Sequence, residues 1–134
     1  MKKSLVIFCL VACIVSAFGF KAIMVTDAGG LGDRSFNDGT WEGIQMAIRE
    51  LDGVEGDVFV SKEQTDYLQN LTKAAEQADV VIGVGFLMSD ILFNVAAQYP
   101  DTYFIGIDIE PSPGQNVPPN LALYTFKEEE GGFL

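Results

Sequence analysis

The sequence predicts an α/β fold, built as a doubly wound parallel sheet with helices on both faces. Three observations support this prediction. Apolar runs of strand length alternate with segments whose apolar residues recur at helical spacing. The runs are apolar throughout rather than alternating with polar residues, as in strands buried on both faces of a parallel sheet. The chain has 134 residues, which is enough for one domain and leaves little room for a second.

Five apolar runs are the expected strands. Along the chain they are Ala22–Val25, Val58–Val60, Val80–Val84, Thr102–Ile107 and Leu121–Phe126. The segment Pro111–Asn120 contains four prolines, which predicts an ordered loop or a linker before the last strand.

Three helices are expected between the first four strands. Ser35 and Thr65 are suitable caps for the first two, while Ser89 and Asp90 begin the third, which Tyr99-Pro100 ends. The predicted buried stripes are Trp41, Ile44, Ile48 and Leu51 in the first helix, Leu68, Leu71, Ala75 and Ala78 in the second, and Ile91, Leu92, Val95 and Ala96 in the third.

Residues 1–17 are predicted to be a signal peptide. Lys2 and Lys3 precede the apolar stretch Leu5–Val15, which is too short to cross a bilayer and has the length of a secretory signal. Two processing routes remain open, namely cleavage after Ala17 or attachment of a lipid to Cys13 in a lipobox-like segment. Both predict an exported protein of the periplasm or cell envelope, anchored to the membrane by lipid in the second case.

The composition excludes several classes of function. A formal net charge of −11 leaves no basic surface for DNA or RNA. The absence of histidine removes Ser-His-Asp and Cys-His catalysis as well as His-ligated metal sites. We therefore expect no nucleic-acid partner, no metal and no cofactor.

Ligands of open parallel sheets bind at the carboxyl ends of the strands. Asp27 and Asp108 directly follow the first and fourth predicted strands and are expected at that edge. The loop Gly30–Ser35 approaches the dinucleotide fingerprint G-x-G-x-x-G/A, but serine replaces the third glycine, and Asp33 would repel a pyrophosphate. Carboxylates accept hydrogen bonds from sugar hydroxyls and ring N–H groups, so the loop favours a neutral polyol or nucleoside. Capping of the loop and first helix by Asp27, Asp33 and Asn37 is an equally good interpretation.

Phe36 lies between Ser35 and Asn37, off the expected helical stripe. Its ring either packs beneath the loop or stacks on a ligand ring, and the sequence leaves both alternatives open. Stacking on a base contributes about 1–3 kcal/mol, and an asparagine such as Asn37 can hydrogen-bond a base edge.

Residues 26–37, Thr-Asp-Ala-Gly-Gly-Leu-Gly-Asp-Arg-Ser-Phe-Asn, followed by Trp41-Glu42-Gly43, resemble the opening signature of the basic membrane protein family. Further similar segments follow in the family's order: Asp79–Asp90, Val95-Ala96, Tyr99–Asp101, Phe104–Asp108, Asn116-Val117 and Phe126–Glu130. These proteins are periplasmic substrate-binding proteins and lipoproteins of ABC transporters, typified by purine-nucleoside receptors.

The resemblance implies a set of ligand-binding residues. In that family two α/β lobes close on a nucleoside. Phe36 would stack on the base and Asn37 would hydrogen-bond to it, while Asp27 and Asp108 would line the cleft wall of the first lobe. Met88 would pack against the ligand. Ser35 would cap the first helix and contact the ligand through its hydroxyl.

The resemblance also implies a domain organisation. Residues 18–126 would form the first lobe of a type I periplasmic binding protein, which is flavodoxin-like, and residues 127–134 would begin a crossover helix to a second lobe. Members of the family are about twice as long or more. The segment Lys127–Leu134 also reads as an unfinished element, so we expect a truncated fold in a fragment of a longer protein.

The leading functional interpretation is therefore a solute-binding protein of an ABC importer. It captures a nucleoside, in particular a purine nucleoside, and delivers it to a membrane permease without chemical conversion. The alternative is a dinucleotide-dependent or Asp-based enzyme on the same fold, with Asp27 and Asp108 as the acid/base pair.

Overall fold

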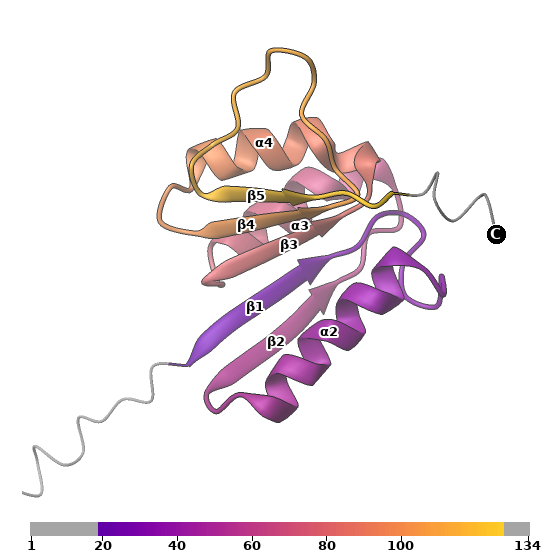
Figure 1. Cartoon of the computed structure of the whole chain (residues 1–134), viewed down its shortest axis with the longest axis vertical. Coiled ribbons are helices and arrows are strands. Elements are labelled where there is room, and N and C mark those ends of the chain that lie inside the picture. Colours follow the sequence, from indigo (N-terminus) through magenta and orange to yellow (C-terminus); the bar gives the residue numbers. More distant parts are fainter. Residues whose placement is uncertain (1–18, 128–134) are drawn as a thin grey trace, which may run out of the picture.

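The computed structural model describes residues 19–127, which form a five-stranded parallel sheet. The strands are β1 (Phe20–Val25), β2 (Val54–Phe59), β3 (Val80–Val84), β4 (Tyr103–Ile107) and β5 (Leu121–Tyr124). Their order across the sheet is β2-β1-β3-β4-β5, so the chain moves outward from β1 in both directions (Figure 1). The predicted α/β doubly wound sheet is confirmed. The predicted signal peptide (residues 1–17), Cys13 and residues 128–134 lie outside the described residues.

Helices lie on both faces of the sheet. α2 (Phe36–Glu50) follows β1 and lies on one face, whereas α3 (Tyr67–Ala75) and α4 (Ser89–Gln98) lie on the other (Figure 1). Short 3₁₀ turns, η1 (Gln64–Asp66) and η2 (Phe86–Met88), precede α3 and α4. Parallel crossovers are right-handed, so a change in the direction of travel across the sheet moves the helix to the opposite face. None of the helices in residues 19–127 is long and apolar enough to span a bilayer.

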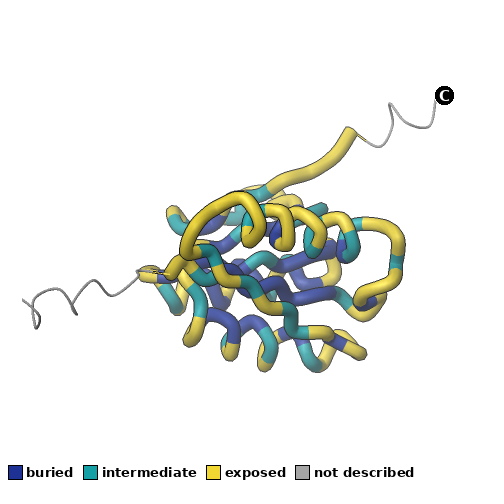
Figure 2. Tube along the Cα trace, turned by 90° about the horizontal axis from the view of Figure 1, so that it is seen from below, coloured by how far each residue is buried: buried dark blue, intermediate teal, exposed yellow. Residues whose placement is uncertain are grey.

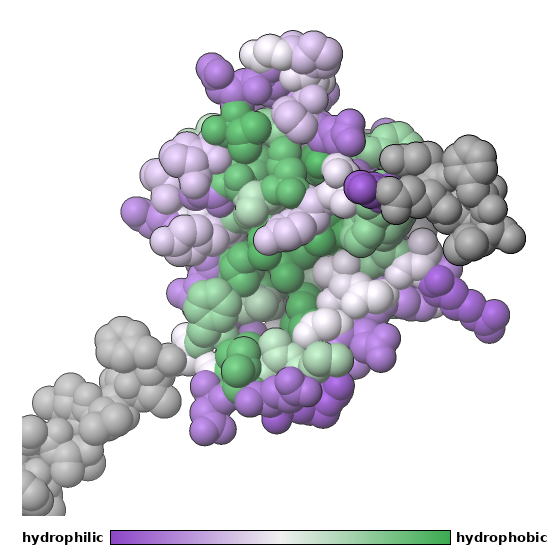
Figure 3. Space-filling view, in the orientation of Figure 1, coloured by the Kyte–Doolittle hydropathy of each residue, from purple (hydrophilic) through white to green (hydrophobic). Residues whose placement is uncertain are grey.

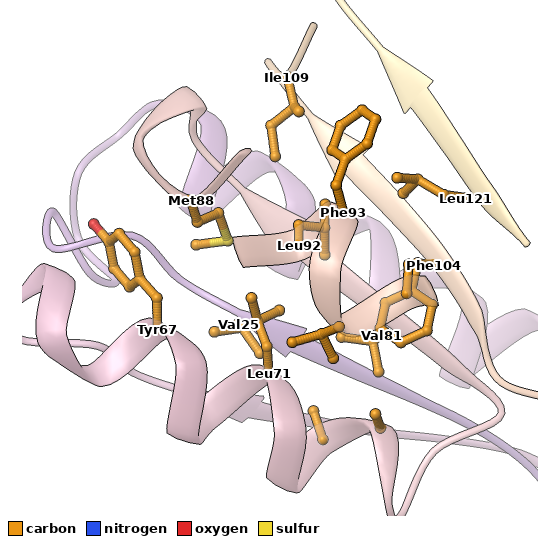
Figure 4. Packing of buried hydrophobic residues seen from close by; sticks show 14 of the residues in the cluster. Val25, Tyr67, Leu71, Val81, Met88, Leu92, Phe93, Phe104, Ile109 and Leu121 are labelled. Carbon is orange, nitrogen blue, oxygen red and sulfur yellow. The ribbon is translucent and has the colours of Figure 1, made fainter. Parts of the chain in front are cut away.

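The larger core cluster lies between the sheet and the pair α3 and α4 (Figure 4). Val25, Val81 and Phe104 project from the strands and meet Leu71 and Leu92 from the helices, all essentially buried. Buried residues are concentrated in the strands and on the inner sides of the helices (Figure 2). This cluster holds the carboxyl ends of β1, β3 and β4 in place, and these ends carry the predicted site.

The α2 face is only partly covered. α2 packs closely on β2 because Gly56 has no side chain, and a Cβ there would lie 2.5 Å from Cγ2 of Ile44. Beyond α2, an apolar hollow of about 460 Å³ lies open over the strands, lined among others by Ile82, Ile105 and Tyr124 (Figure 3). Within the described residues, helices therefore lie on both faces as predicted, but α2 does not extend over β3–β5.

Element boundaries differ most from the sequence predictions at β2 and α3, while β1, β4 and β5 differ by one or two residues at one end. β2 begins at Val54 rather than at Val58, and it is an edge strand whose polar residues alternate with partly buried ones. Thr65 lies in η1, and α3 begins at Tyr67. Tyr67 is fully buried, whereas Leu68, which was predicted to be on the buried stripe, is 55% exposed.

The proline-rich segment before β5 is an ordered loop rather than a free linker. At its end, the side-chain amide of Asn120 donates to the carbonyl oxygens of Ala96, Tyr99 and Thr102, at distances from 2.8 to 3.0 Å. These bonds attach the start of β5 to the end of α4 and to the segment that leads into β4.

Candidate functional site

Asp27 follows β1, and its carboxylate organises the loop that leads into α2. Oδ1 of Asp27 accepts hydrogen bonds from the backbone N–H of Gly29 and from Nδ2 of Asn37, both at 2.8 Å. Oδ2 faces the start of the next loop, because a Cβ on Gly85 would lie 2.8 Å from it. Gly85 has φ +97°, so glycine supplies both the backbone conformation and the space beside Asp27.

Asn37 joins two carboxylates of this loop. Its side chain is only 2% exposed, and Nδ2 donates to Oδ1 of Asp27 at 2.8 Å and to Oδ2 of Asp33 at 2.9 Å. Its Oδ1 accepts from the N–H of Asp27 at 3.3 Å. Both amide hydrogens are therefore used inside the loop, which gives Asn37 a positioning role in this structure.

Asp33 caps α2, and the prediction that Ser35 does so is wrong. Ser35 occupies the N-cap position, but its hydroxyl makes no capping hydrogen bond. The carboxylate of Asp33 instead accepts from the backbone N–H groups of Ser35 at 2.9 Å and of Asn37 and Asp38 at 3.1 Å. Burial by itself would raise the pKa of Asp33, but these hydrogen bonds and the amide of Asn37 outweigh it and lower the pKa below its usual value.

A second hollow, of about 590 Å³, lies at the carboxyl ends of β3, β4 and β5. Asp108 lines it and adopts φ +58°, a conformation that is uncommon for residues other than glycine. Among the described residues, the lining contains three carboxylates, those of Asp90, Asp108 and Glu110, and no basic side chain. Ser89 and the aromatic rings of Phe86 and Phe126 also line the hollow.

Asp27 and Asp108 share an edge of the sheet but do not line one hollow. Their strands, β1 and β4, are separated by β3. Strands two positions apart are about 10 Å apart, and Asp27 is absent from the lining of the hollow that Asp108 borders. The structure thus groups Asp27 with Asn37 and places Asp108 in a separate recess nearby.

Phe36 is the first residue of α2 rather than a loop residue, and it is half-buried. On one side it packs against the smaller core cluster under α2, which contains Met24, Ile44 and Val84. Its ring also contacts that of Phe126, with the centroids 5.1 Å apart and the planes tilted by 32°. Burial and ring contact therefore coexist at Phe36.

Met88 and Ser35, two predicted ligand-binding residues, differ in their exposure to solvent. Met88 is completely buried in the larger core, so in this structure it has no surface to offer a ligand (Figure 4). Ser35 is exposed at the start of α2.

Within the described residues no group of three or more acidic or cysteine side chains is placed to hold a metal ion.

Sequence reasoning missed three residues that shape this edge. The hydroxyl of Tyr67 accepts a hydrogen bond from the N–H of Ala28 at 3.1 Å and so attaches α3 to the loop after β1. Phe86 and Phe126 line the acidic hollow. Their position just past the ends of two parallel strands was the available signal, but both look like ordinary core residues in the sequence.

Residues 20–134 match the family model described as ABC transporter substrate-binding protein PnrA-like. The ABC transporter nucleoside-binding protein BmpA of Lactococcus lactis is 33% identical over 118 residues, which cover 85% of this chain and 32% of that protein. An uncharacterized lipoprotein of Pyrococcus furiosus is 37% identical over 116 residues, covering 85% of this chain and 28% of that protein.

A crystal structure of an ABC transporter solute-binding protein from Aeropyrum pernix is also similar. It shares 31% sequence identity at a TM-score of 0.72, over 83% of this chain and 30% of that chain. The chain spans about a third of the length of the curated relatives it matches. On the match over residues 20–134, the chain belongs to the PnrA-like family of ABC transporter substrate-binding proteins, the basic membrane protein family that its loop signature resembles.

Proposed function

We propose that this protein is exported and captures a nucleoside, in particular a purine nucleoside, for uptake through an ABC permease in the membrane. Residues 1–17 direct export, with either cleavage after Ala17 or lipid attachment at Cys13. Residues 18–126 form the first lobe and one wall of the binding cleft, and residues 127–134 begin the crossover to a second lobe. No chemical conversion of the ligand is involved.

The observation that carries this proposal is the charge of the carboxyl edge. In the part of the chain that the structure describes, the hollow beside Asp108 is lined by three carboxylates and no basic side chain, and Asp27 lies on the neighbouring part of the same edge. Carboxylates accept hydrogen bonds from ribose hydroxyls and base N–H groups, and they repel phosphate. A neutral nucleoside therefore fits this edge better than a nucleotide does.

The site residues take the following roles. Asp27 and Asp108 accept hydrogen bonds from the ligand, and Phe36 contributes with Phe126 to the aromatic surface for the base. Asn37 acts by holding Asp27 and the start of α2 in place. Ser35 offers an exposed hydroxyl, whereas Met88 supports the edge from beneath.

The names of two relatives support the proposal. BmpA of Lactococcus lactis is named a nucleoside-binding protein of an ABC transporter, and the Pyrococcus furiosus relative is named a lipoprotein. The first name supports the ligand class and the permease partner. The second supports export and attachment to the membrane.

Titration calorimetry on the protein as its gene encodes it tests the ligand class. Inosine, adenosine and guanosine should bind and be recovered unchanged, while the corresponding monophosphates should give no heat.

Asp108→Asn should weaken nucleoside binding by about 1.5–3 kcal/mol, because a hydrogen bond to a charged acceptor is lost. Asp101→Asn is the matched control, since Asp101 is exposed and directly precedes the segment entering β4 at the opposite end of the sheet. Binding of a nucleotide in preference to every nucleoside would overturn the proposal.

A further inference from the structure

The loop after β1 is held from both faces of the sheet. The four backbone N–H groups of residues 27–30 all donate hydrogen bonds. The third and fourth groups donate to Asp27 itself, one to its Oδ1 and the other to its carbonyl oxygen. The first donates to the side chain of Asn37 in α2, whereas the second, that of Ala28, donates to the hydroxyl of Tyr67 in α3. Because α2 and α3 lie on opposite faces of the sheet, each face supplies one acceptor to the loop (Figure 1).

The hydroxyl of Tyr67 is placed by a well-packed part of the molecule. The Tyr67 side chain is fully buried in the larger core cluster, at the start of α3 (Figure 4). Asp66 fixes the turn before it, because its carboxylate accepts hydrogen bonds from the backbone N–H groups of Lys62 at 2.9 Å and Glu63 at 3.1 Å. Close packing keeps a buried ring in one rotamer, so the hydroxyl is a fixed acceptor for the loop.

The bond to Tyr67 acts on the backbone next to the Asp27 carboxylate. Ala28 directly follows Asp27, and the planar peptide unit that joins them carries the N–H that donates to Tyr67. Ala28 is exposed, so without the hydroxyl this N–H can turn to water, and the loop shifts with it. Oδ1 of Asp27 is bonded within the loop to Gly29 and Asn37, so the carboxylate moves together with the backbone. A ligand of Asp27 then binds only the fraction of molecules in which the loop is in place.

We propose that Tyr67 is a positioning residue for ligand binding, whose hydroxyl holds the loop after β1 so that Asp27 faces the ligand. This inference rests on the proposed function and adds to it a residue of α3, on the face of the sheet opposite to α2. Tyr67 is fully buried, so it acts through Ala28 and touches no ligand itself. Asn37 holds the loop from the α2 side, and Tyr67 holds it from the α3 side.

Tyr67→Phe tests this role in the protein as its gene encodes it, because it removes the hydroxyl and keeps the ring. Inosine binding, measured by titration calorimetry, should weaken by about threefold to thirtyfold, the range for residues that act on a site through others. Ala74→Gly is the matched control, because Ala74 is fully buried in the same core cluster near the other end of α3. It should lower the melting temperature, since glycine weakens a helix, and leave the affinity for inosine unchanged. The pair of variants separates a positioning role from a general loss of stability.

Amide hydrogen exchange, followed by NMR, provides a readout that needs no ligand. The amide of Ala28 should exchange slowly in the parent and faster in Tyr67→Phe, while the amides of β3 keep their parent rates. In Ala74→Gly the amide of Ala28 should stay as slow as in the parent.

The outcomes distinguish this inference from the proposed function. If inosine binds the parent and Tyr67→Phe equally well, or if Ala74→Gly weakens binding by the same factor, the positioning role is wrong while the proposed function stands. If no nucleoside binds the parent, the proposed function fails, and equal exchange of the Ala28 amide in the parent and Tyr67→Phe would overturn the positioning role as well. Should Tyr67→Phe fail to fold, rapid exchange of the Ala28 amide in the parent would overturn it.

Discussion

Asn37 and Asp33 are residue types that occur both in ligand sites and in loops, and here they build the loop after β1. Asn37 donates to Asp27 and Asp33, and Asp33 accepts three backbone N–H groups at the start of α2. The sequence could place these residues at the carboxyl edge of the sheet because the position follows from the strand pattern. It indicated Asp33 only as one of several candidate caps beside Ser35, since the choice between them depends on a backbone in which Gly30, Gly32 and Arg34 all have positive φ.

The low pKa of Asp33 makes the stability of the fold depend on pH. Its folded-state pKa is below the unfolded value of about 3.9, so its contribution is complete above that value. The contribution is lost as the pH falls through the folded-state pKa, because the proton then removes the acceptor charge. We expect Asp33→Asn to melt at a lower temperature than the parent at pH 6 and to lose less melting temperature between pH 5 and pH 3.

Thermal unfolding followed by circular dichroism across that pH range measures the effect. Asp101→Asn serves as the control, because Asp101 is an exposed carboxylate that accepts no hydrogen bond from the described residues. Parallel acid profiles for the parent and Asp33→Asn would contradict a capping role for the charged carboxylate.

At the scale of the elements, β3 and β4 were predicted well, because each is a buried central strand with a continuous apolar run. β2 was predicted too short, since Glu55 and Asp57 point outward on an edge strand and interrupt the pattern. α3 was shifted because its burial depends on Tyr67, which contacts a loop 39 residues away in sequence. Long-range contacts of this kind leave no local signal.

The packing of α2 on β2 requires a residue without a side chain at Gly56, which gives a prediction at the scale of the elements. In Gly56→Ala the new Cβ would lie 2.5 Å from Cγ2 of Ile44, so α2 must move away. We expect a loss of about 1–3 kcal/mol in the free energy of unfolding, measured by urea denaturation. Gly43→Ala is the control with the opposite sign, because a Cβ there meets nothing within 4 Å and alanine favours the helix by about 0.5–1 kcal/mol.

Adding Ile44→Leu to Gly56→Ala should recover part of the loss, since leucine carries no branch at its Cβ. If Gly56→Ala proved as stable as the parent, the close approach of α2 to β2 would not constrain the fold.

At the scale of the whole molecule, an apolar hollow lies over β3–β5 beside α2 on the surface of the described residues (Figure 3). Exposed apolar patches of this kind drive association. The formal charge of −11 opposes the approach of two copies, and salt screens that repulsion. We therefore expect this chain to self-associate, and to do so more strongly in 500 mM than in 20 mM sodium chloride, as measured by sedimentation velocity.

Tyr124→Lys should reduce this association, because Tyr124 lines the hollow and is 56% exposed. Leu68→Lys is the matched control on the opposite face of the sheet, at 55% exposure. A monomer at both salt concentrations that unfolds cooperatively would show that the hollow does not drive association.

The left-handed backbone conformation of Asp108 has a consequence for attempts to raise the thermal stability of this protein. A non-glycine residue in that conformation is strained, and here the strained residue lines the acidic hollow. Selection for thermal robustness alone would favour glycine at position 108, and the carboxylate would disappear with the strain. A thermostable descendant obtained that way would have lost the carboxylate that we propose accepts a hydrogen bond from the ligand.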